Sequence, residues 1–231
     1  MTYAEAAGRT DVMWLRPSAS TGSRQPTPRT KGSVRVWVYD PGTNRELGCE
    51  SMLEFRFALM LMADPEVVCI EDQPKARKYL VPGESKRRKH TFDFLVTYRS
   101  GKKIAFAVKP AEQVEEEGIE LIVDLITVQS LAGFADEAFV VTDELILPEM
   151  AENAEDIVEA RKSRNAADCR AVLEFMQQHF EPISMHDVCN AFQDRGWARC
   201  ALLNLIYDGL VEHLDPTQTF DEAPLVRTVF N

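Results

Sequence analysis

The most restrictive feature of this chain is the stretch HTFDFLVTYRSGKKIAFAVKP, residues 90–110. Two apolar runs flank the dipeptide SG, and this pattern predicts two strands joined by a tight turn. Each run carries a charge that a strand interior rarely holds: Asp93 lies inside FDFLV, and Lys109 ends IAFAV. Because paired strands run side by side, the two charges can lie close together. Alone, such a pair is typical of a weak ion pair at a sheet rim.

Strand alternation also predicts which residues of the first run share a face. One face is expected to hold Phe92, Phe94 and Val96. The other is expected to hold Asp93, Leu95 and Thr97.

Glu54 changes the interpretation of the hairpin charges. It lies in ESMLEFRFALMLMAD, which predicts a helix so broadly apolar that it must be largely buried. Glutamate is seldom buried unless it is paired or bound to a metal. A helix glutamate, a strand aspartate and a strand-end lysine suit metal-dependent phosphodiester hydrolysis. We therefore predict Glu54, Asp93 and Lys109 as catalytic residues, with Glu54 and Asp93 binding Mg²⁺, or Mn²⁺ as its substitute.

The order of the remaining patterns predicts three regions. Residues 1–31 are rich in Ser, Thr, Pro and Arg, which indicates a flexible basic arm, either solvated or lying along DNA. Its basic residues in this role would be Arg16, Arg24, Arg29 and Lys31. Residues 32–164 mix strands and helices, including one expected helix over 114–134, and predict an α/β domain with a mixed sheet. Residues 165–231 predict three helices followed by two paired strands, which is typical of a winged-helix-like domain.

Charge is distributed unevenly along the chain. The net charge is −11, yet residues 1–110 hold 19 Lys and Arg against 12 Asp and Glu, whereas the remainder holds 7 against 25. The basic part therefore suits contact with DNA phosphates. The predicted nucleic-acid-binding residues are Lys86, Arg87, Arg88, Lys89, Lys102 and Lys103. The third C-terminal helix, expected over residues 197–210, carries only Arg199 as a basic residue, which favours protein contact over base reading.

Other sequence signals narrow the class of protein. The five cysteines form no CxxC pair, which argues against a zinc ribbon and a disulfide framework. No apolar run approaches 18 residues, and the N-terminus lacks the order of a signal peptide. We therefore expect a cytoplasmic protein without a membrane span.

The order of these motifs resembles the TnsA-type endonuclease subunit of heteromeric, TnsABC-like transposases. The matching stretches are ESMLEFRFALMLMADPEVVCIEDQP, HTFDFLVTYRSGKKIAFAVKP and GFADEAFVVTDELI. The resemblance implies a restriction-endonuclease-like fold, with a mixed sheet flanked by helices, and cleavage of double-stranded DNA at transposon ends. It also implies two partners, a TnsB-like transposase and a TnsC-like ATPase regulator. Gln73 and Pro74 match the QP of that family, and we read them as a strand end and turn.

The chain departs from the family pattern at Ala107, where the family usually has a glutamate or glutamine that serves the metal. A methyl group cannot bind a cation, so the site keeps two carboxylates, with Glu112 as a possible replacement ligand. Three alternatives stay open: an endonuclease subunit, a catalytically impaired nuclease-like module for DNA binding or assembly, and a nuclease of the same fold acting alone. We expect weak or absent nicking by the isolated protein and a gain in Mg²⁺-dependent nicking for Ala107→Glu.

Overall fold

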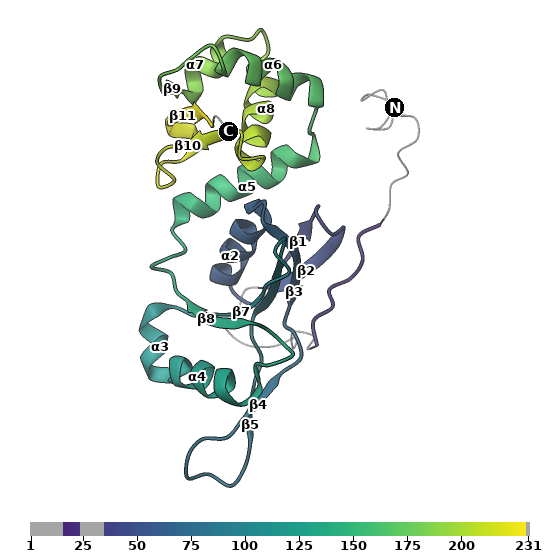
Figure 1. Cartoon of the computed structure of the whole chain (residues 1–231), viewed down its shortest axis with the longest axis vertical. Helices are drawn as coiled ribbons and strands as arrows, with labels where there is room; N and C mark the ends of the chain where they lie inside the picture. The colour runs from purple at the N-terminus through teal and green to yellow at the C-terminus, as the bar shows by residue number, and fades with distance from the viewer. Residues whose placement is uncertain (1–15, 24–34, 230–231) are drawn as a thin grey trace.

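A computed structural model of the chain describes residues 16–23 and 35–229. The molecule is elongated (Figure 1). A sheet with its helices occupies the middle, a helical C-terminal part lies at one end, and a two-stranded hairpin projects from the other. The mixed α/β architecture predicted from the sequence is confirmed.

The central sheet has four strands in the order β3-β6-β7-β8. Their bounds are Val67–Asp72, Phe94–Tyr98, Lys103–Val108 and Glu137–Val141. β6 and β7 form the predicted antiparallel hairpin, and Gly101 takes the positive φ of 83° that its turn requires. β7 and β8 pair in parallel, so the sheet is mixed.

One face of this sheet is covered by α2 (Met52–Ala63), which follows the hairpin of β1 (Val36–Asp40) and β2 (Arg45–Cys49). The helix begins at Ser51, whose side chain accepts a hydrogen bond from the backbone of Glu54. Its apolar side chains share a buried core with alternate residues of β6 and β7, among them Phe94 and Phe106. The broad apolar stripe is therefore a buried face, as predicted.

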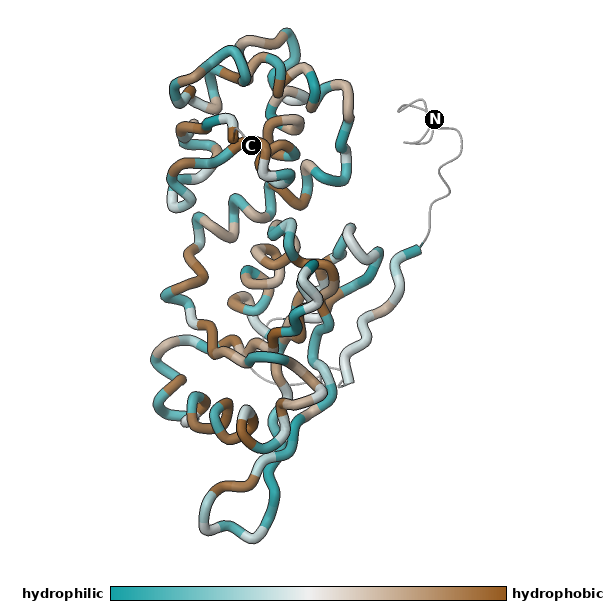
Figure 2. The backbone as a smooth tube through the Cα atoms, viewed as in Figure 1, coloured by the Kyte–Doolittle hydropathy of each residue, from teal (hydrophilic) through white to brown (hydrophobic). Residues whose placement is uncertain are grey.

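The opposite face is covered by α3 (Ala111–Glu117) and α4 (Ile119–Ser130). The prediction of one continuous helix here is wrong. Gly118 adopts a left-handed conformation with φ 61°, which ends α3 and redirects the chain into α4. Three residues of α4, Ile119, Val123 and Ile126, pack in the second core on this face. Figure 2 shows brown, apolar segments in α2 and α4, which lie on either side of the strands.

The prediction that Phe92 lies on the same face of the sheet as Phe94 is also wrong. The chain bends at Asp93, and β6 starts only at Phe94. Phe92 therefore packs in the core beneath α4 together with Leu95, whereas Phe94 belongs to the core beneath α2. Simple alternation fails because it assumes an unbroken strand. The bend leaves Asp93 at the end of the sheet.

The projecting hairpin consists of β4 (Arg77–Tyr79) and β5 (Arg88–His90), paired antiparallel. The last three residues of the sequence KRRKH form β5, because they pair with β4 from Arg77 to Tyr79. Lys86 and Arg87 remain in the exposed connecting loop.

The C-terminal part contains α6 (Ala166–Met176), α7 (Met185–Asn190) and α8 (Arg195–Tyr207). As predicted, Ser184 caps α7. β10 (Val211–His213) and β11 (Leu225–Thr228) then pair antiparallel, and β9 (Ile183–Ser184) completes the order β10-β11-β9. A short 3-10 helix, Phe220–Glu222, lies in the connecting loop.

The helix α5 (Pro148–Lys162) joins the two parts. Ala154 and Val158 belong to the core that α2 shares with the sheet. Ile157 and Ala160 belong to the C-terminal core. The helix before the expected boundary at residue 165 is therefore common to both cores.

Residues 16–23 differ from the expected flexible arm, because they run along β2. Ser18 forms a parallel bridge with Arg45, and its backbone exchanges hydrogen bonds with Asn44 and Glu46. This contact reflects the serines of the segment, which find backbone and side-chain partners on the domain. Arg24, Arg29 and Lys31 lie outside the described residues, while Arg16 is exposed.

In the part of the chain that the structure describes, no helix combines the length and apolar character needed to cross a membrane.

Candidate active site at the end of the sheet

Asp93 is held at the bend that precedes β6. Its Oδ2 atom accepts a hydrogen bond from the backbone of Val108 at 2.8 Å. Its Oδ1 atom accepts one from the side-chain amide of Gln73 at 3.3 Å. The carboxylate is therefore fixed between the end of β7 and the end of β3.

Glu54 is held by the start of α2. Its Oε2 atom accepts from the backbone of Glu50 at 2.7 Å, and its Oε1 atom accepts from the hydroxyl of Ser51 at 3.0 Å. Ser51 in turn accepts from the Glu54 backbone at 3.0 Å. The residue thus has a capping role, and the sequence SMLE is the signal for it. Each carboxylate oxygen has further lone pairs, so capping leaves room for a cation.

The charges of the three predicted residues act on one another. Burial and the Glu54 carboxylate raise the pKa of Asp93 to about 7. Burial also raises the pKa of Glu54, and the charge of Lys109 opposes the rise in both carboxyl groups. Because such effects need proximity, the structure brings Glu54, Asp93 and Lys109 around one region at the end of the sheet.

A buried thiol lies in the same region. The pKa of Cys49 is raised far above its usual value, first by burial and then by the charges of Glu54, Asp72 and Asp93. Three acidic side chains therefore surround this end of β2. The sequence analysis gave Asp72 no role, because the QP that directly follows it was read only as a strand end and turn.

Lys109 lies directly after β7, where its backbone donates to Val141 of β8 at 3.0 Å. Its ammonium group is 3.4 Å from the carboxylate of Glu117 at the end of α3, and its side chain is 30% exposed. The acid that contacts the lysine is therefore Glu117. Glu112 is exposed, and no contact joins it to Asp93 or Lys109 among the described residues.

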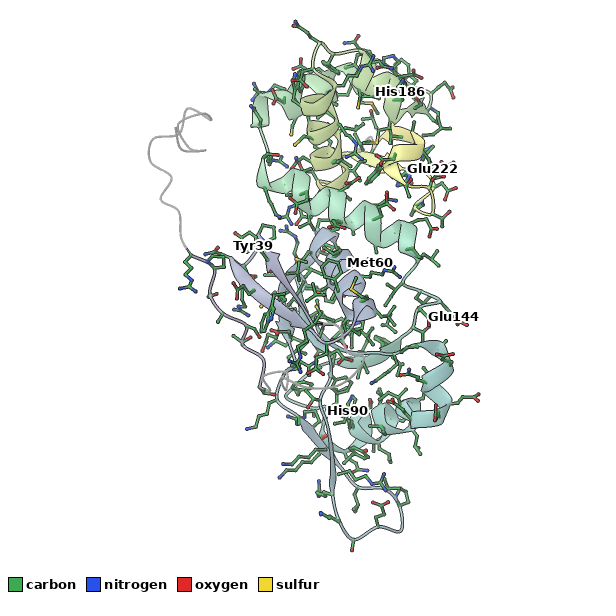
Figure 3. All side chains as sticks on the ribbon, turned by 180° about the vertical axis from the view of Figure 1, so that it is seen from behind. Tyr39, Met60, His90, Glu144, His186 and Glu222 are labelled. Carbon is green, nitrogen blue, oxygen red and sulfur yellow. The ribbon has the colours of Figure 1, made fainter. Side chains whose placement is uncertain are left out.

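His90 ends β5 beside this cluster, at the foot of the projecting hairpin (Figure 3). Its ring meets that of Phe92 edge to face, with centroids 5.0 Å apart. Burial and the charge of Lys109 lower the pKa of His90 to about 4, so its ring is neutral at pH 7. Its Nε2 atom is buried and has no hydrogen-bond partner among the described residues. Sequence reasoning treated this histidine as structural or exposed.

Ala107 is fully buried in the core beneath α4. Phe92, Leu95 and Ile119 belong to the same core. The position at which the family usually has a metal ligand is therefore occupied by an apolar side chain in an apolar setting.

The donor set suits a cation bound by few protein groups. Among the described residues, no three His, Cys, Asp or Glu side chains are arranged to hold a metal ion. Mg²⁺ often takes only one or two carboxylates and keeps several waters. Glu54 and Asp93 offer two such carboxylates. Burial raises the pKa of both, and the Glu54 charge adds to the rise at Asp93, an effect that a bound cation would oppose.

The predicted basic residues fall into two groups. Lys86, Arg87 and Lys89 are exposed on the β4–β5 hairpin, where Arg88 pairs with Glu84. At the β6–β7 turn, Lys102 pairs with Glu137 at 2.8 Å, and the backbone of Lys103 donates to Asp136. The acidic neighbours of the second group reduce its net positive charge.

Part of the chain matches a known protein family. Residues 64–162 match the family described as "TnsA-like endonuclease N terminal". This part of the chain is therefore similar to a TnsA-like endonuclease domain. A comparison with curated proteins finds no match. The matched region includes Asp93, Ala107 and Lys109, so the similarity covers the sheet end just described. Glu54 precedes the matched region.

Proposed function

We propose that this protein is the Mg²⁺-dependent DNA endonuclease subunit of a heteromeric transposase, which cleaves DNA strands at transposon ends together with a separate transposase. The observation that carries the proposal is the meeting of Glu54, Asp93 and Lys109 at one end of the sheet of a TnsA-like endonuclease domain. Nuclease activity is what membership of this domain family suggests.

In this proposal, Glu54 and Asp93 hold the cation through their carboxylates. When bound, Mg²⁺ lowers the pKa of a water molecule and neutralises charge on the phosphate oxygens. Lys109 contributes a positive charge that orients the attacking water or stabilises the transition state. Glu117 holds the ammonium group until a phosphate competes for it, since their contact is partly exposed and therefore weak.

The DNA would lie against the β4–β5 hairpin, where Lys86, Arg87 and Lys89 are exposed. These residues offer charge for the phosphate backbone without base recognition. Sequence choice would come from partners, a TnsB-like transposase and a TnsC-like ATPase regulator.

The C-terminal part would be a winged-helix-like domain that contacts protein. Its three helices followed by the β10–β11 pair support this assignment. Arg199, on α8, is held by Asp156 at 2.6 Å and by Asp221 at 3.0 Å. A guanidinium group engaged by two carboxylates is poorly placed to read base edges.

The test is nicking of supercoiled plasmid that carries a transposon end, with and without the transposase. Lys109→Ala should reduce Mg²⁺-dependent nicking by at least about 100-fold while DNA affinity changes less than about twofold. Lys162→Ala serves as the control, because Lys162 lies at the end of α5 and pairs with Glu159. Equal nicking by Lys109→Ala and the unchanged protein would refute the assignment.

The second candidate function is a catalytically impaired nuclease-like module for DNA binding or assembly. The buried Ala107 favours it, because the site has one protein ligand fewer than the family pattern. Calorimetric titration with Mn²⁺ separates the two functions. Binding that disappears in Asp93→Ala supports the nuclease, whereas no binding by the unchanged protein supports the impaired module.

A further inference from the structure

Gln73 has a backbone conformation that is unusual for its residue type. It follows β3 with φ 43°, in the left-handed region that favours glycine, and only 2% of its surface is exposed. Non-glycine residues keep such conformations only where their surroundings hold them. The contacts of Gln73 therefore indicate which neighbouring groups hold this strained conformation.

Two of those contacts go to Asp93. The backbone of Gln73 donates to the Asp93 carbonyl at 2.9 Å, and its side-chain amide donates to the Asp93 carboxylate at 3.3 Å. Both ends of one residue are thus fixed by one neighbour. Because Asp93 sits at a bend rather than within a strand, these bonds decide where its carboxylate points.

Gln73 is held from its other side by the segment of residues 16–23, here called the strap. Ser23 donates its backbone N–H to the carbonyl of Gln73 at 2.8 Å and its hydroxyl to the carbonyl of Pro74 at 3.0 Å. The strap therefore closes a chain of hydrogen bonds from Ser23 through Gln73 to Asp93.

The strap has its own buried anchor. The hydroxyl of Ser20 donates to Oδ2 of Asp72 at 2.5 Å, and the same oxygen accepts from the backbone of Gly48 at 2.9 Å. Asp72 is 2% exposed, and its other oxygen has no hydrogen-bond partner among the described residues. A buried carboxylate with few donors depends strongly on each one. This dependence explains why a serine-rich N-terminal segment lies on the domain.

We propose that Gln73 is a positioning residue for Asp93, and that the strap, anchored at Asp72, holds Gln73 in place. The proposal rests on the proposed function, because it makes the N-terminal segment part of the metal-binding end of the sheet. Its consequence is that the segment outside the matched TnsA-like region determines how the Asp93 carboxylate is presented.

The test uses amide hydrogen exchange in the full chain without metal. The amide of Val108 reports on the Asp93 carboxylate, to which it donates, and the amide of Gln73 reports on its bond to the Asp93 carbonyl. Ser23→Pro removes the N–H that binds Gln73, whereas Ser23→Ala removes only the hydroxyl. We expect Ser23→Pro to accelerate exchange at both reporters about tenfold, since one hydrogen bond is lost, and Ser23→Ala to change it less than about threefold. The amide of Val96, farther along β6, should not change.

A second pair of variants acts on the anchor. Ser20→Asp places a carboxylate against Asp72 and should accelerate exchange at the same reporters. Thr21→Ala is its control, because Thr21 contacts Arg45 and not Asp72. Unchanged reporter exchange in both Ser23→Pro and Ser20→Asp overturns the proposal. So does equal acceleration at Val96, which would mean general destabilisation.

Mn²⁺ titration then links the strap to the site. Ser23→Pro and Gln73→Met should each weaken Mn²⁺ binding about tenfold while the protein stays folded at the titration temperature, and Gln73→Glu should fail to restore it because its side chain cannot donate. If the unchanged protein binds no Mn²⁺, the proposed metal-dependent function is contradicted. The exchange result still decides the role of the strap, so the two failures are distinguishable.

Discussion

Glu54 combines two roles at the residue scale, and one pair of variants separates them. Glu54→Gln keeps an oxygen for the donors at the start of α2 but removes the charge that a cation needs. Glu54→Ala removes both. We expect both variants to lose Mg²⁺-dependent nicking, whereas only Glu54→Ala loses about 1 kcal/mol of unfolding free energy. Plasmid nicking and urea denaturation check the two effects. Full activity of Glu54→Gln would leave the residue with its capping role alone.

Asp93 makes stability depend on pH in the absence of metal. Its pKa is raised from 3.8 to about 7 by burial and by Glu54. The folded protein therefore binds this proton more tightly than the unfolded chain does. The resulting stability is fully present below about pH 4 and is lost as the pH rises to about 7.

We predict that the unchanged protein loses roughly 3–4 kcal/mol of unfolding free energy relative to Asp93→Asn between these pH values. Urea denaturation of both proteins in EDTA from pH 4 to 8 measures the difference. A difference that does not vary with pH would contradict the raised pKa.

Ala107→Glu should lower the free energy of unfolding, an effect that the sequence alone could not predict. The new carboxylate enters a fully buried position in the apolar core beneath α4. We expect a loss of about 3 kcal/mol in EDTA, with partial recovery in Mn²⁺ if the carboxylate reaches the site. Ala107→Met, similar in size but uncharged, is the control for overpacking. Thermal unfolding with and without Mn²⁺ measures both effects, and a neutral Ala107→Glu in EDTA would show that the position is more open than its burial indicates.

At the scale of elements, the β4–β5 hairpin is the strongest candidate for DNA contact. Lys86, Arg87 and Lys89 are exposed, and no ion pair joins them to another described residue. Replacing all three with alanine should weaken DNA binding uniformly across sequences. The slope of log affinity against log salt should fall in magnitude by roughly 0.9 for each phosphate that the variant no longer neutralises.

Fluorescence anisotropy with two unrelated duplexes at several salt concentrations measures this slope. Lys102→Ala is the matched control, because Lys102 already pairs with Glu137. An unchanged slope in the triple variant would remove the hairpin from the DNA surface.

At the scale of the whole molecule, α5 couples the two cores. Arg161 strengthens that connection, since its guanidinium lies 3.7 Å over the ring of Tyr207 on α8 and donates to the carbonyl of Met62 on α2 at 3.2 Å. Separating the parts would expose the apolar side chains that α5 buries on both sides. We expect the sheet domain and the C-terminal part to unfold together.

Two tryptophans report on the two parts. Trp37 lies on β1 and Trp197 on α8. Trp37→Phe and Trp197→Phe, each made in a Trp14→Phe background, isolate one reporter at a time. The two fluorescence transitions in urea should coincide within about 0.2 M. Well-separated midpoints would show that the parts are independent despite the shared helix.

Elements with a local cause could be predicted from the sequence alone. Alternating apolar residues around SG determined the β6–β7 hairpin, and the 3.6-residue stripe determined α2. The order of charged residues on these elements was enough to select Glu54, Asp93 and Lys109. Each of these inferences needs only neighbouring residues, because periodicity and turn chemistry are properties of short segments.

Contacts between distant residues, in contrast, could be identified only in the folded chain. The bend at Asp93 moved Phe92 to the other core, and Gly118 divided a predicted helix. Glu117 rather than Glu112 reached Lys109, and Ala107 proved to be buried. Ser20 of the strap donates a hydrogen bond to Asp72, which is 52 residues away in the sequence. Contacts of this kind depend on chain directions at several distant positions at once, so no local pattern encodes them.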